Sequence, residues 1–146
     1  MHLEEVALAE IKELRYLVLW PHLASAEECV IDADHEPTTF QLAVKDHDKV
    51  VCVGTFLIDE KEEFSEKKQY RLRAMGTHPD YRGRGLGTKL IARAKNILAK
   101  KSVEILWCDA RVEASEFYSK IGFSKLGGQY MVPDIGPHYL MYTVIE

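Results

Sequence analysis

Three glycines and two arginines alternate just before a stretch of the chain with helical periodicity. Residues 82–88 read Arg-Gly-Arg-Gly-Leu-Gly-Thr. The first N–H groups of a helix have no partner inside the helix and lie at the positive end of its dipole, and glycine lets a ligand come close to the main chain. The pattern is typical of a site for phosphate oxygens, with Arg82 and Arg84 as additional cations.

Two common phosphate-binding motifs do not fit these residues. A P-loop needs Gly-Lys followed by Ser or Thr, whereas here Lys89 comes after the hydroxyl of Thr88. A dinucleotide fingerprint needs Gly-x-Gly-x-x-Gly, but the glycines stand at positions 83, 85 and 87. The motif that remains is Arg-x-x-Gly-x-Gly.

This motif resembles the acetyl-CoA signature of the GNAT superfamily of N-acetyltransferases, Gln/Arg-x-x-Gly-x-Gly/Ala, which Arg82, Gly85 and Gly87 match. A proline-containing turn at 78–81 precedes the arginine, as it does in that family. The second motif of the family is similar to a later set of residues, which comprises Ala114, Phe117, Tyr118, Gly122 and Phe123. Together the two motifs cover about a third of the chain in the order of the family.

The resemblance implies acetyl-CoA as co-substrate and no metal. In this family the main chain of a bulged fourth strand pairs with the pantetheine arm, and the glycine loop holds the pyrophosphate. The residues expected to bind acetyl-CoA are Met75, Gly76, Thr77, Arg82, Gly83, Arg84, Gly85, Leu86, Gly87, Thr88 and Arg111. Arg111 stands where the second motif often has asparagine, so it could instead reach a phosphate or an acidic substrate.

The resemblance also implies a proton donor but leaves the general base open. Tyr118 matches the tyrosine that protonates the departing CoA thiolate in many members. Residues 69–77 contain no carboxylate to act as the base that many members carry there. Candidates for this role are His138, which we prefer because of its residue type, Asp109 and a water relay. Cys108 lies in an apolar strand and is expected to be a packing residue.

The predicted function is therefore transfer of an acetyl group from acetyl-CoA to a primary amine, by direct attack in a ternary complex. A small molecule is expected as the acceptor. The turn at 20–22 and the acidic run at 27–36 could line its pocket and attract a cationic amine, although such runs are commonly solvated loops. The alternative is a CoA-binding regulatory or interaction module that has lost the chemistry.

Composition narrows the class of protein independently. With 146 residues and 47% hydrophobic content, the chain suits a single domain over 1–146. A net charge of −4 argues against nucleic acid as a partner. Three widely spaced cysteines suggest neither disulfides nor a zinc site, and no long apolar run or secretory leader opens the chain. We therefore expect a cytoplasmic protein with no membrane segment and a possible homodimer.

Hydrophobic periodicity predicts an α/β (α+β) fold with a central mixed, mostly antiparallel twisted sheet of about six to seven strands, flanked by about four helices. A first helix carries Ile11, Leu14 and Val18 on one face and ends before Pro21. Later helices are expected over 86–98 and 114–121, the second closed by Gly122. Strands are expected over 2–5, 40–44, 50–58, 70–77, 103–110, 124–131 and 139–145. The polar turn at 46–48 is expected to join the second and third strands in a hairpin, and the fourth is expected to carry a bulge and to follow a loop over 59–68.

Overall fold

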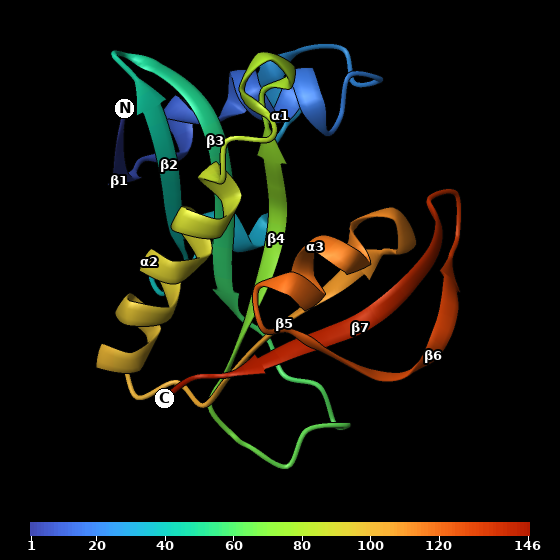
Figure 1. Ribbon diagram of the computed structural model, residues 1–146. Helices are drawn as coiled ribbons and strands as arrows, with labels where there is room; N and C mark the ends of the chain where they lie inside the picture. The colour runs from blue at the N-terminus through green and yellow to red at the C-terminus, as the bar shows by residue number, and fades with distance from the viewer. The chain divides into compact units, whose positions relative to one another are not determined.

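The computed structural model describes all 146 residues (Figure 1), and the chain divides into two compact units. Unit 1 comprises Met1–Ile58 and Leu72–Ile97, and unit 2 comprises Asp59–Arg71 and Leu98–Glu146. Seven strands are hydrogen-bonded in the order β1-β2-β3-β4-β5-β7-β6. No helix is both long and apolar enough to cross a membrane.

The strands of unit 1 are β1 (His2–Val6), β2 (Phe40–Asp46), β3 (Lys49–Ile58) and most of β4 (Gln69–Thr77). β1 and β3 both pair with β2 in antiparallel register. The turn between β2 and β3 is as short as the sequence predicts, because His47 takes a left-handed conformation with a φ of 56°. The predicted hairpin is therefore confirmed.

β4 departs from a regular strand at Ala74. This residue has a φ of 52°, in the left-handed region that L-residues seldom adopt. The apolar residues of the strand break the alternation of a regular strand at Met75, and the sequence predicts a bulge for that reason. The irregularity is confirmed, and the structure places it one residue before Met75.

Two helices belong to unit 1, α1 (Lys12–Val18) and α2 (Leu86–Lys100) as far as Ile97. α1 packs Ile11 and Leu14 against Val53 of β3. α2 buries the apolar stripe that the periodicity predicts, with Leu90, Ile91 and Ala94 at most 1% exposed. A Cβ atom on Gly54 would lie 3.0 Å from Leu90, so the glycine lets α2 pack closely against β3.

The predicted number of helices is wrong, because the structure has three α-helices and not four. The chain between α1 and β2 forms only short 3₁₀ turns, at Ala26–Glu28 and Asp32–His35. There Glu28 accepts a hydrogen bond from Ala24 N–H at 2.9 Å, and Asp34 accepts one from Ile31 N–H at 2.8 Å. Such local side-chain bonds compete with the continuous bonding of an α-helix.

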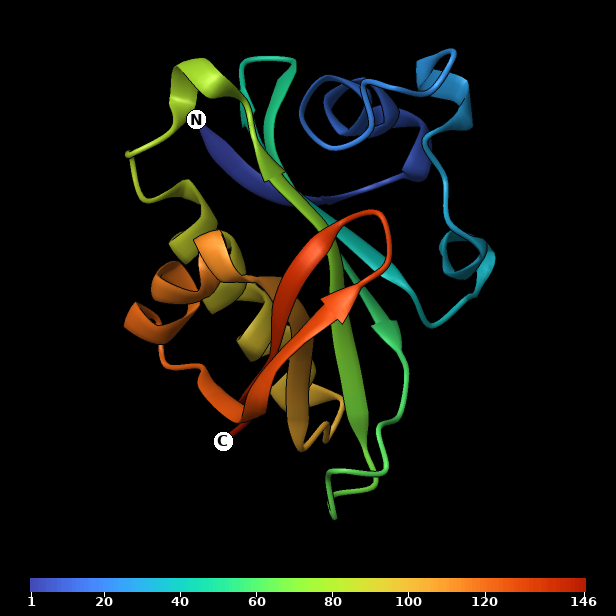
Figure 2. The same cartoon turned by 90° about the vertical axis from the view of Figure 1, so that its right-hand side faces the viewer.

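Unit 2 contains β5 (Ile105–Arg111), α3 (Ser115–Lys120), β6 (Ser124–Val132) and β7 (Gly136–Val144) (Figure 2). β5 and β6 both pair with β7 in antiparallel register, and the start of β4 pairs with β5 in parallel over Gln69–Arg71. α3 ends as predicted at Gly122, which has a φ of 99°. β7 begins three residues earlier than the predicted strand, since only 133–135 form the turn.

The core of unit 2 consists of Phe64, Ile105, Trp107 and Leu140. The loop at 59–68 is fixed to this core by Gln69, whose side chain accepts a hydrogen bond from Lys61 N–H at 2.8 Å and donates one to Glu66 O at 2.8 Å. Trp107 Nε1 also donates to Asp59 O at 3.0 Å. The predicted loop is therefore confirmed, and its backbone is held in place at several points.

Candidate active site

The glycine loop of unit 1 leads directly into α2. Gly83 and Gly85 have φ values of 77° and 75°, which favour glycine over any residue with a side chain. Lys89 N–H donates to Gly85 O at 3.1 Å and makes the first bond of the helix. The N–H groups of Leu86, Gly87 and Thr88 precede that bond, so they lack a partner within the helix and are suited to an anion.

Space for such an anion is open above the loop. Cβ atoms built on Gly83 and Gly85 would meet no other atom within 4 Å. Arg82 is exposed and donates from Nε to Thr77 O at 3.2 Å, and Arg84 donates to Asp80 O at 3.1 Å. A guanidinium has five N–H donors, so each arginine keeps further donors for a ligand. The Leu86 side chain is buried in the core, which leaves its backbone as the only group available.

The turn at 78–81, before the loop, is fixed by its own side chains. Asp80 N–H donates to His78 Nδ1 at 3.1 Å, and the Arg84 guanidinium lies 4.9 Å from the centre of the Tyr81 ring. The Tyr81 hydroxyl donates to Asp46 of β2 at 2.5 Å. These contacts hold the two arginines next to the start of α2.

Residues 75–77 of β4 are half-buried within unit 1. The Thr77 hydroxyl donates to the Cys52 sulfur at 3.4 Å, so its side chain is turned toward β3. A Cβ atom on Gly76 would lie 2.6 Å from Val18 Cγ2 and 3.4 Å from Leu19 Cδ2. Gly76 is therefore needed for the packing of α1, a reason for this glycine that the sequence did not predict.

In unit 2, Tyr118 lies on α3 and is 9% exposed. Its ring packs between Phe117, with ring centres 5.1 Å apart, and Phe123, with ring centres 5.3 Å apart. The second motif that the sequence identifies therefore forms one aromatic cluster around this tyrosine. Such packing fixes the direction of the phenol.

The structure brings Arg111 and His138 together as partners across β5 and β7. Arg111 is exposed, and no hydrogen bond or ion pair engages its guanidinium. His138 is buried, and its Nδ1 lies 2.8 Å from Gly136 O. A carbonyl oxygen only accepts, so Nδ1 carries the proton and Nε2 is the nitrogen of the neutral ring that can take one up.

Asp109, the other candidate base, already uses both carboxylate oxygens. Arg71 donates to its Oδ2 at 2.8 Å, and the Tyr130 hydroxyl donates to its Oδ1. Burial and this bond to Asp109 raise the pKa of the Tyr130 phenol, which keeps the proton on the tyrosine. Since both Asp109 oxygens already accept hydrogen bonds within the protein, we prefer His138 as the candidate base.

Cys108 has the environment of a packing residue. It is 3% exposed, and burial together with the neighbouring Asp109 carboxylate raises the pKa of its thiol. A thiol that stays protonated is a poor nucleophile. The structure also contains no group of three or more His, Cys, Asp or Glu side chains that could hold a metal ion.

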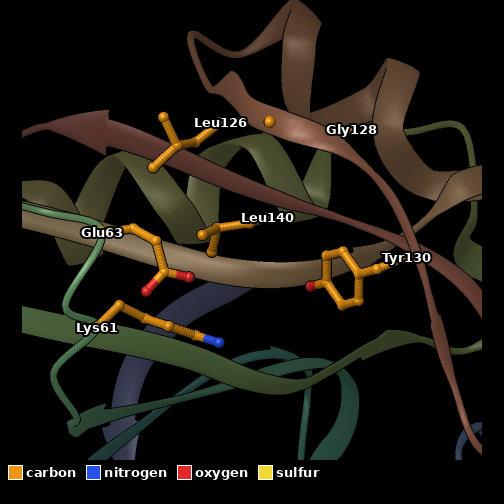
Figure 3. A pocket seen from close by; sticks show the side chains of 7 residues that line it. Lys61, Glu63, Leu126, Gly128, Tyr130 and Leu140 are labelled. Atoms are coloured by element: carbon orange, nitrogen blue, oxygen red, sulfur yellow. The ribbon is translucent and has the colours of Figure 1, made fainter.

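A pocket of about 530 Å³ opens in unit 2 between the loop at 59–68 and strands β6 and β7 (Figure 3). Its lining residues are Lys61, Glu63, Leu126, Gly127, Gly128, Tyr130 and Leu140. Tyr130 is shared with the candidate base, because its ring lies over His138 with ring centres 6.2 Å apart. The volume falls within the range of about 300–1,000 Å³ that is usual for small-molecule sites.

A second pocket, of about 570 Å³, lies in unit 1 beside α1. Its lining residues are Glu10, Glu13, Leu14, Tyr16, Leu17, Pro21, Asp48, Lys49, Val50 and His78. Pro21 belongs to the turn at 20–22 that the sequence predicts to border an acceptor. None of the residues at 27–36 lines either pocket.

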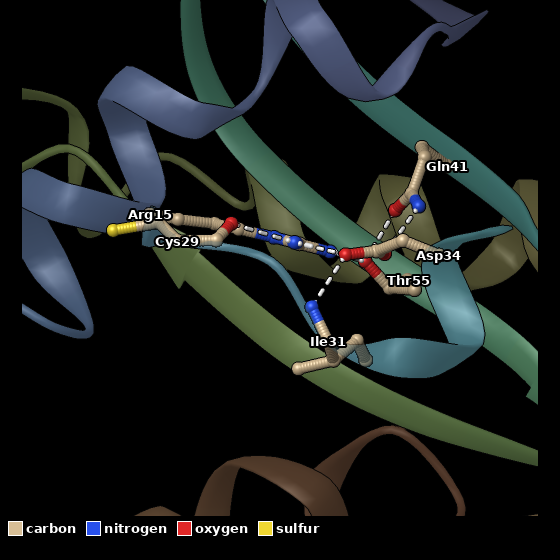
Figure 4. Close-up of polar contacts among 6 residues, drawn as sticks. All are labelled: Arg15, Cys29, Ile31, Asp34, Gln41 and Thr55. Carbon is tan, nitrogen blue, oxygen red and sulfur yellow. Dashed lines mark hydrogen bonds and ion pairs between the residues drawn. The ribbon is translucent and has the colours of Figure 1, made fainter. Parts of the chain in front are cut away.

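Asp34 of the acidic run at 27–36 is engaged by a cation inside the protein, so it is not free to bind an amine. Its carboxylate accepts two hydrogen bonds from Arg15, at 2.7 and 2.9 Å, and both side chains are fully buried (Figure 4). Burial raises the pKa of the Asp34 carboxyl, but hydrogen bonds from Arg15 and Ile31 N–H outweigh it and hold the pKa below its ordinary value. The charge of Asp34 is thus neutralised inside unit 1.

The side chains that surround Tyr130 and Asp109 could not be found from sequence motifs. Strand register sets their neighbours, since Tyr130 stands opposite His138 and Arg71 stands opposite Trp107. The Arg71 guanidinium lies 4.9 Å from the centre of the Trp107 ring. Lys61 and Glu63 lie in a charged loop where the sequence shows no pattern.

Comparisons with known proteins agree on one family. Residues 6–123 match the Acetyltransferase (GNAT) family. The chain is 31% identical over 146 residues to YitI, an uncharacterized N-acetyltransferase of Bacillus subtilis (strain 168), with 100% of this chain and 97% of that protein covered.

Solved structures share the fold over the whole chain. The structure of an aminoglycoside 6'-N-acetyltransferase complexed with coenzyme A has a TM-score of 0.81 at 16% identity, with 100% of this chain and 98% of that chain covered. An aminoglycoside 6'-acetyltransferase type Ii has a TM-score of 0.77 at 19% identity, with 100% and 98% covered. The predicted α+β fold is therefore confirmed, with seven strands and three helices.

Proposed function

The chain belongs to the Acetyltransferase (GNAT) family, and on this premise we propose that it transfers an acetyl group to a primary amine of a small molecule. It is an acyltransferase with acetyl-CoA as its co-substrate. The observation that carries the proposal is the pair of left-handed glycines, Gly83 and Gly85, directly before α2. In this proposal the amine attacks acetyl-CoA directly.

The pyrophosphate of acetyl-CoA binds the main chain at 86–88. Three N–H groups at the start of a helix of 15 residues offer hydrogen bonds and the positive end of the helix dipole. The open space above Gly83 and Gly85 admits phosphate oxygens, and the exposed guanidinium groups of Arg82 and Arg84 neutralise their charge. The Thr88 hydroxyl is exposed and can add a further donor.

The remaining contacts to the co-substrate come from two strands. The backbone of Met75, Gly76 and Thr77 pairs with the amide groups of the pantetheine arm, and the irregularity at Ala74 supports this role because it interrupts regular pairing of the strand. Arg111 has an exposed guanidinium without an internal partner, and it binds a phosphate or an acidic group of the acceptor.

The chemical step needs one proton acceptor and one proton donor. The amine nitrogen attacks the thioester carbonyl carbon, a C–N bond forms, and the C–S bond breaks with CoA leaving as a thiolate. His138 Nε2 takes the proton that the amine loses, and the Tyr118 hydroxyl protonates the thiolate. The buried, protonated Cys108 supports direct transfer without an acyl-enzyme.

A small-molecule acceptor is favoured by the size of the pockets and by the neighbours in structure. Each unit contains a pocket of 530 to 570 Å³, large enough for a small amine. The aminoglycoside acetyltransferases whose fold is similar act on small amines by their names. We propose the pocket of unit 2 as the acceptor site, because Tyr130 connects it to His138.

The first test is calorimetric titration with acetyl-CoA, with pantetheine as the control that lacks the pyrophosphate. We expect binding that requires the pyrophosphate. Turnover is then followed as thiol release over a panel of primary amines. Tight binding without turnover on any amine would instead support a CoA-binding regulatory module, and absence of binding would contradict the phosphate site.

The roles of the two proton-transfer residues are tested by substitution. Tyr118→Phe should lower kcat by about 10²-fold or more with an unchanged Kd for acetyl-CoA, whereas Tyr139→Phe, which removes a hydroxyl near the surface, should change neither. His138→Gln should lower kcat by about 10²-fold or more with an unchanged Kd for acetyl-CoA. Unchanged turnover in Tyr118→Phe would eliminate this tyrosine as the acid.

A further inference from the structure

The pocket of unit 2 carries opposite charges on one side and Tyr130, whose ring packs on His138, on the other. Lys61 and Glu63 extend from the loop at 59–68, and Figure 3 shows both head groups pointing into the pocket. Tyr130 faces them from β6, with Leu140 in between (Figure 3). A ligand that fills this pocket therefore meets two charges at one end and Tyr130 at the other.

Neither charge at the first end is neutralised within the protein. No ion pair or hydrogen bond engages the Glu63 carboxylate, and the Lys61 ammonium has only the face of Trp107, 5.3 Å from the ring centre. The backbone of Lys61 is itself fixed by the hydrogen bond from its N–H to Gln69. An ammonium and a carboxylate two residues apart are complementary to a ligand with the reverse pair of charges.

The walls between the two ends are apolar or bare. Leu126 and Leu140 line the pocket beside the core of unit 2. Gly127 and Gly128 add no side chain, and Cβ atoms built on them would meet nothing within 4 Å. This middle part suits a short aliphatic chain better than a polar one.

We propose that the acceptor is an α-amino acid whose side chain ends in a primary amine. The proposal rests on the acetyltransfer proposed above. Glu63 binds the α-ammonium group, Lys61 binds the α-carboxylate, and the methylene chain lies along Leu126 and Leu140. The terminal amine then reaches the Tyr130 side of the pocket, where His138 accepts its proton as the new amide bond forms and CoA leaves.

The opposite orientation explains fewer of the observations. If Glu63 held the reacting amine, that amine would lie on the side of the pocket away from Tyr130 and His138. A monoamine without other charges would leave both Lys61 and Glu63 without a function. An acceptor with three charged groups uses both head groups and leaves its reacting amine beside the base.

Four related amines separate the contributions of the charges. L-lysine carries both the α-ammonium and the α-carboxylate, cadaverine lacks the carboxylate, 6-aminohexanoate lacks the α-ammonium, and pentylamine lacks both. L-ornithine is included as a shorter diamino acid. We expect kcat/KM for one of the two diamino acids to exceed that of cadaverine and of 6-aminohexanoate by about tenfold each, and that of pentylamine by more.

Substitutions then connect each charge to its residue. Lys61→Gln should lower kcat/KM for the diamino acid about tenfold and leave cadaverine unchanged, and Glu63→Gln should lower it similarly and leave 6-aminohexanoate unchanged. Lys67→Gln and Glu62→Gln are the matched controls, because both residues are exposed on the same loop and neither lines the pocket. Acetyl-CoA affinity should stay the same in all four variants.

The outcomes distinguish this inference from the proposed function. If pentylamine or another amine of the panel is acetylated as fast as the diamino acids, the inference is overturned while acetyltransfer stands. If Lys61→Gln and Glu63→Gln act like their controls, the pocket assignment is overturned. If no amine is acetylated although acetyl-CoA binds, both the inference and the proposed function are overturned.

Discussion

Substitution of Gly76 by alanine tests the closest packing contact in unit 1. The new Cβ atom would lie 2.6 Å from Val18 Cγ2, about 1 Å closer than the normal carbon–carbon contact distance of roughly 3.5–4.0 Å. Val18 is β-branched at the end of a helix and has one preferred rotamer, so it cannot turn away freely. Overpacking of this kind costs about 1–3 kcal/mol, and we expect about 2 kcal/mol for Gly76→Ala.

The assay is urea denaturation of the single and double variants. Val18→Ala should cost about 1 kcal/mol by loss of a half-buried side chain, yet it also removes the atom that the new Cβ would meet. The double variant should therefore cost about 1 kcal/mol, and not the sum of about 3. The control is Gly128→Ala, where a Cβ atom meets nothing within 4 Å, and its free energy of unfolding should be unchanged.

The same variants separate packing from ligand binding. Gly76→Ala should lower Tm by about 6–8 °C, and the double variant should recover most of this loss. Because Gly76 is proposed to bind pantetheine through its backbone, the double variant should also recover its affinity for acetyl-CoA. Additive effects of the two substitutions on unfolding, within about 0.5 kcal/mol, would refute the packing argument.

Three further perturbations test other parts of the structure. Arg15→Met leaves a buried carboxylate without its counter-ion and should lower the free energy of unfolding in urea by about 3–5 kcal/mol, so a loss below about 1 kcal/mol would contradict the ion pair. Because the pKa of Asp34 is lowered on folding, the pair stabilises the fold above roughly pH 4 and loses this effect as the pH falls further. Asp34→Asn should then make the free energy of unfolding depend less on pH in the acid range. An unchanged acid unfolding curve, followed by circular dichroism, would argue against this linkage. Gly85→Asp should weaken acetyl-CoA binding at least about tenfold more than Gly85→Asn, with equal Tm values for the two variants. Both side chains tolerate the left-handed backbone, and only aspartate repels phosphate. Equal Kd values of the two variants in calorimetry would place the pyrophosphate elsewhere.

Elements with a strong local signal could be predicted from the sequence. The apolar spacing of Leu90, Ile91 and Ala94 predicted α2 because a helical face needs residues three and four apart, and all three are buried. The hairpin of β2 and β3 followed from its polar turn. The number of helices was wrong because side chains such as Asp34 bond locally to the backbone, and propensity alone does not show which polar residues will do so.

The residues of the candidate site also differ in whether the sequence could predict them: those with local causes could be found, and those that depend on distant contacts could not. Gly83 and Gly85 could be identified because a left-handed backbone before a helix is a property of adjacent residues. Tyr130 could not, because its contacts to Asp109 and His138 depend on the register of β5, β6 and β7. The single domain, the homodimer, the cytoplasmic location and the exclusion of nucleic acid stay predictions.

One long-range contact, the ion pair between Arg15 and Asp34, has a signal in the hydrophobic periodicity of α1. Arg15 follows Ile11 by four residues and Leu14 by one, so it lies on the apolar face of α1, and its side chain is 0% exposed. A buried guanidinium requires an acidic partner, since an unpaired charge in the core is strongly unfavourable. The first run of acids after α1 along the chain is 27–36, and Asp34 of that run is the partner. An arginine on an apolar helix face thus predicts that one acid nearby in the chain is structural, and Asp34 is that acid.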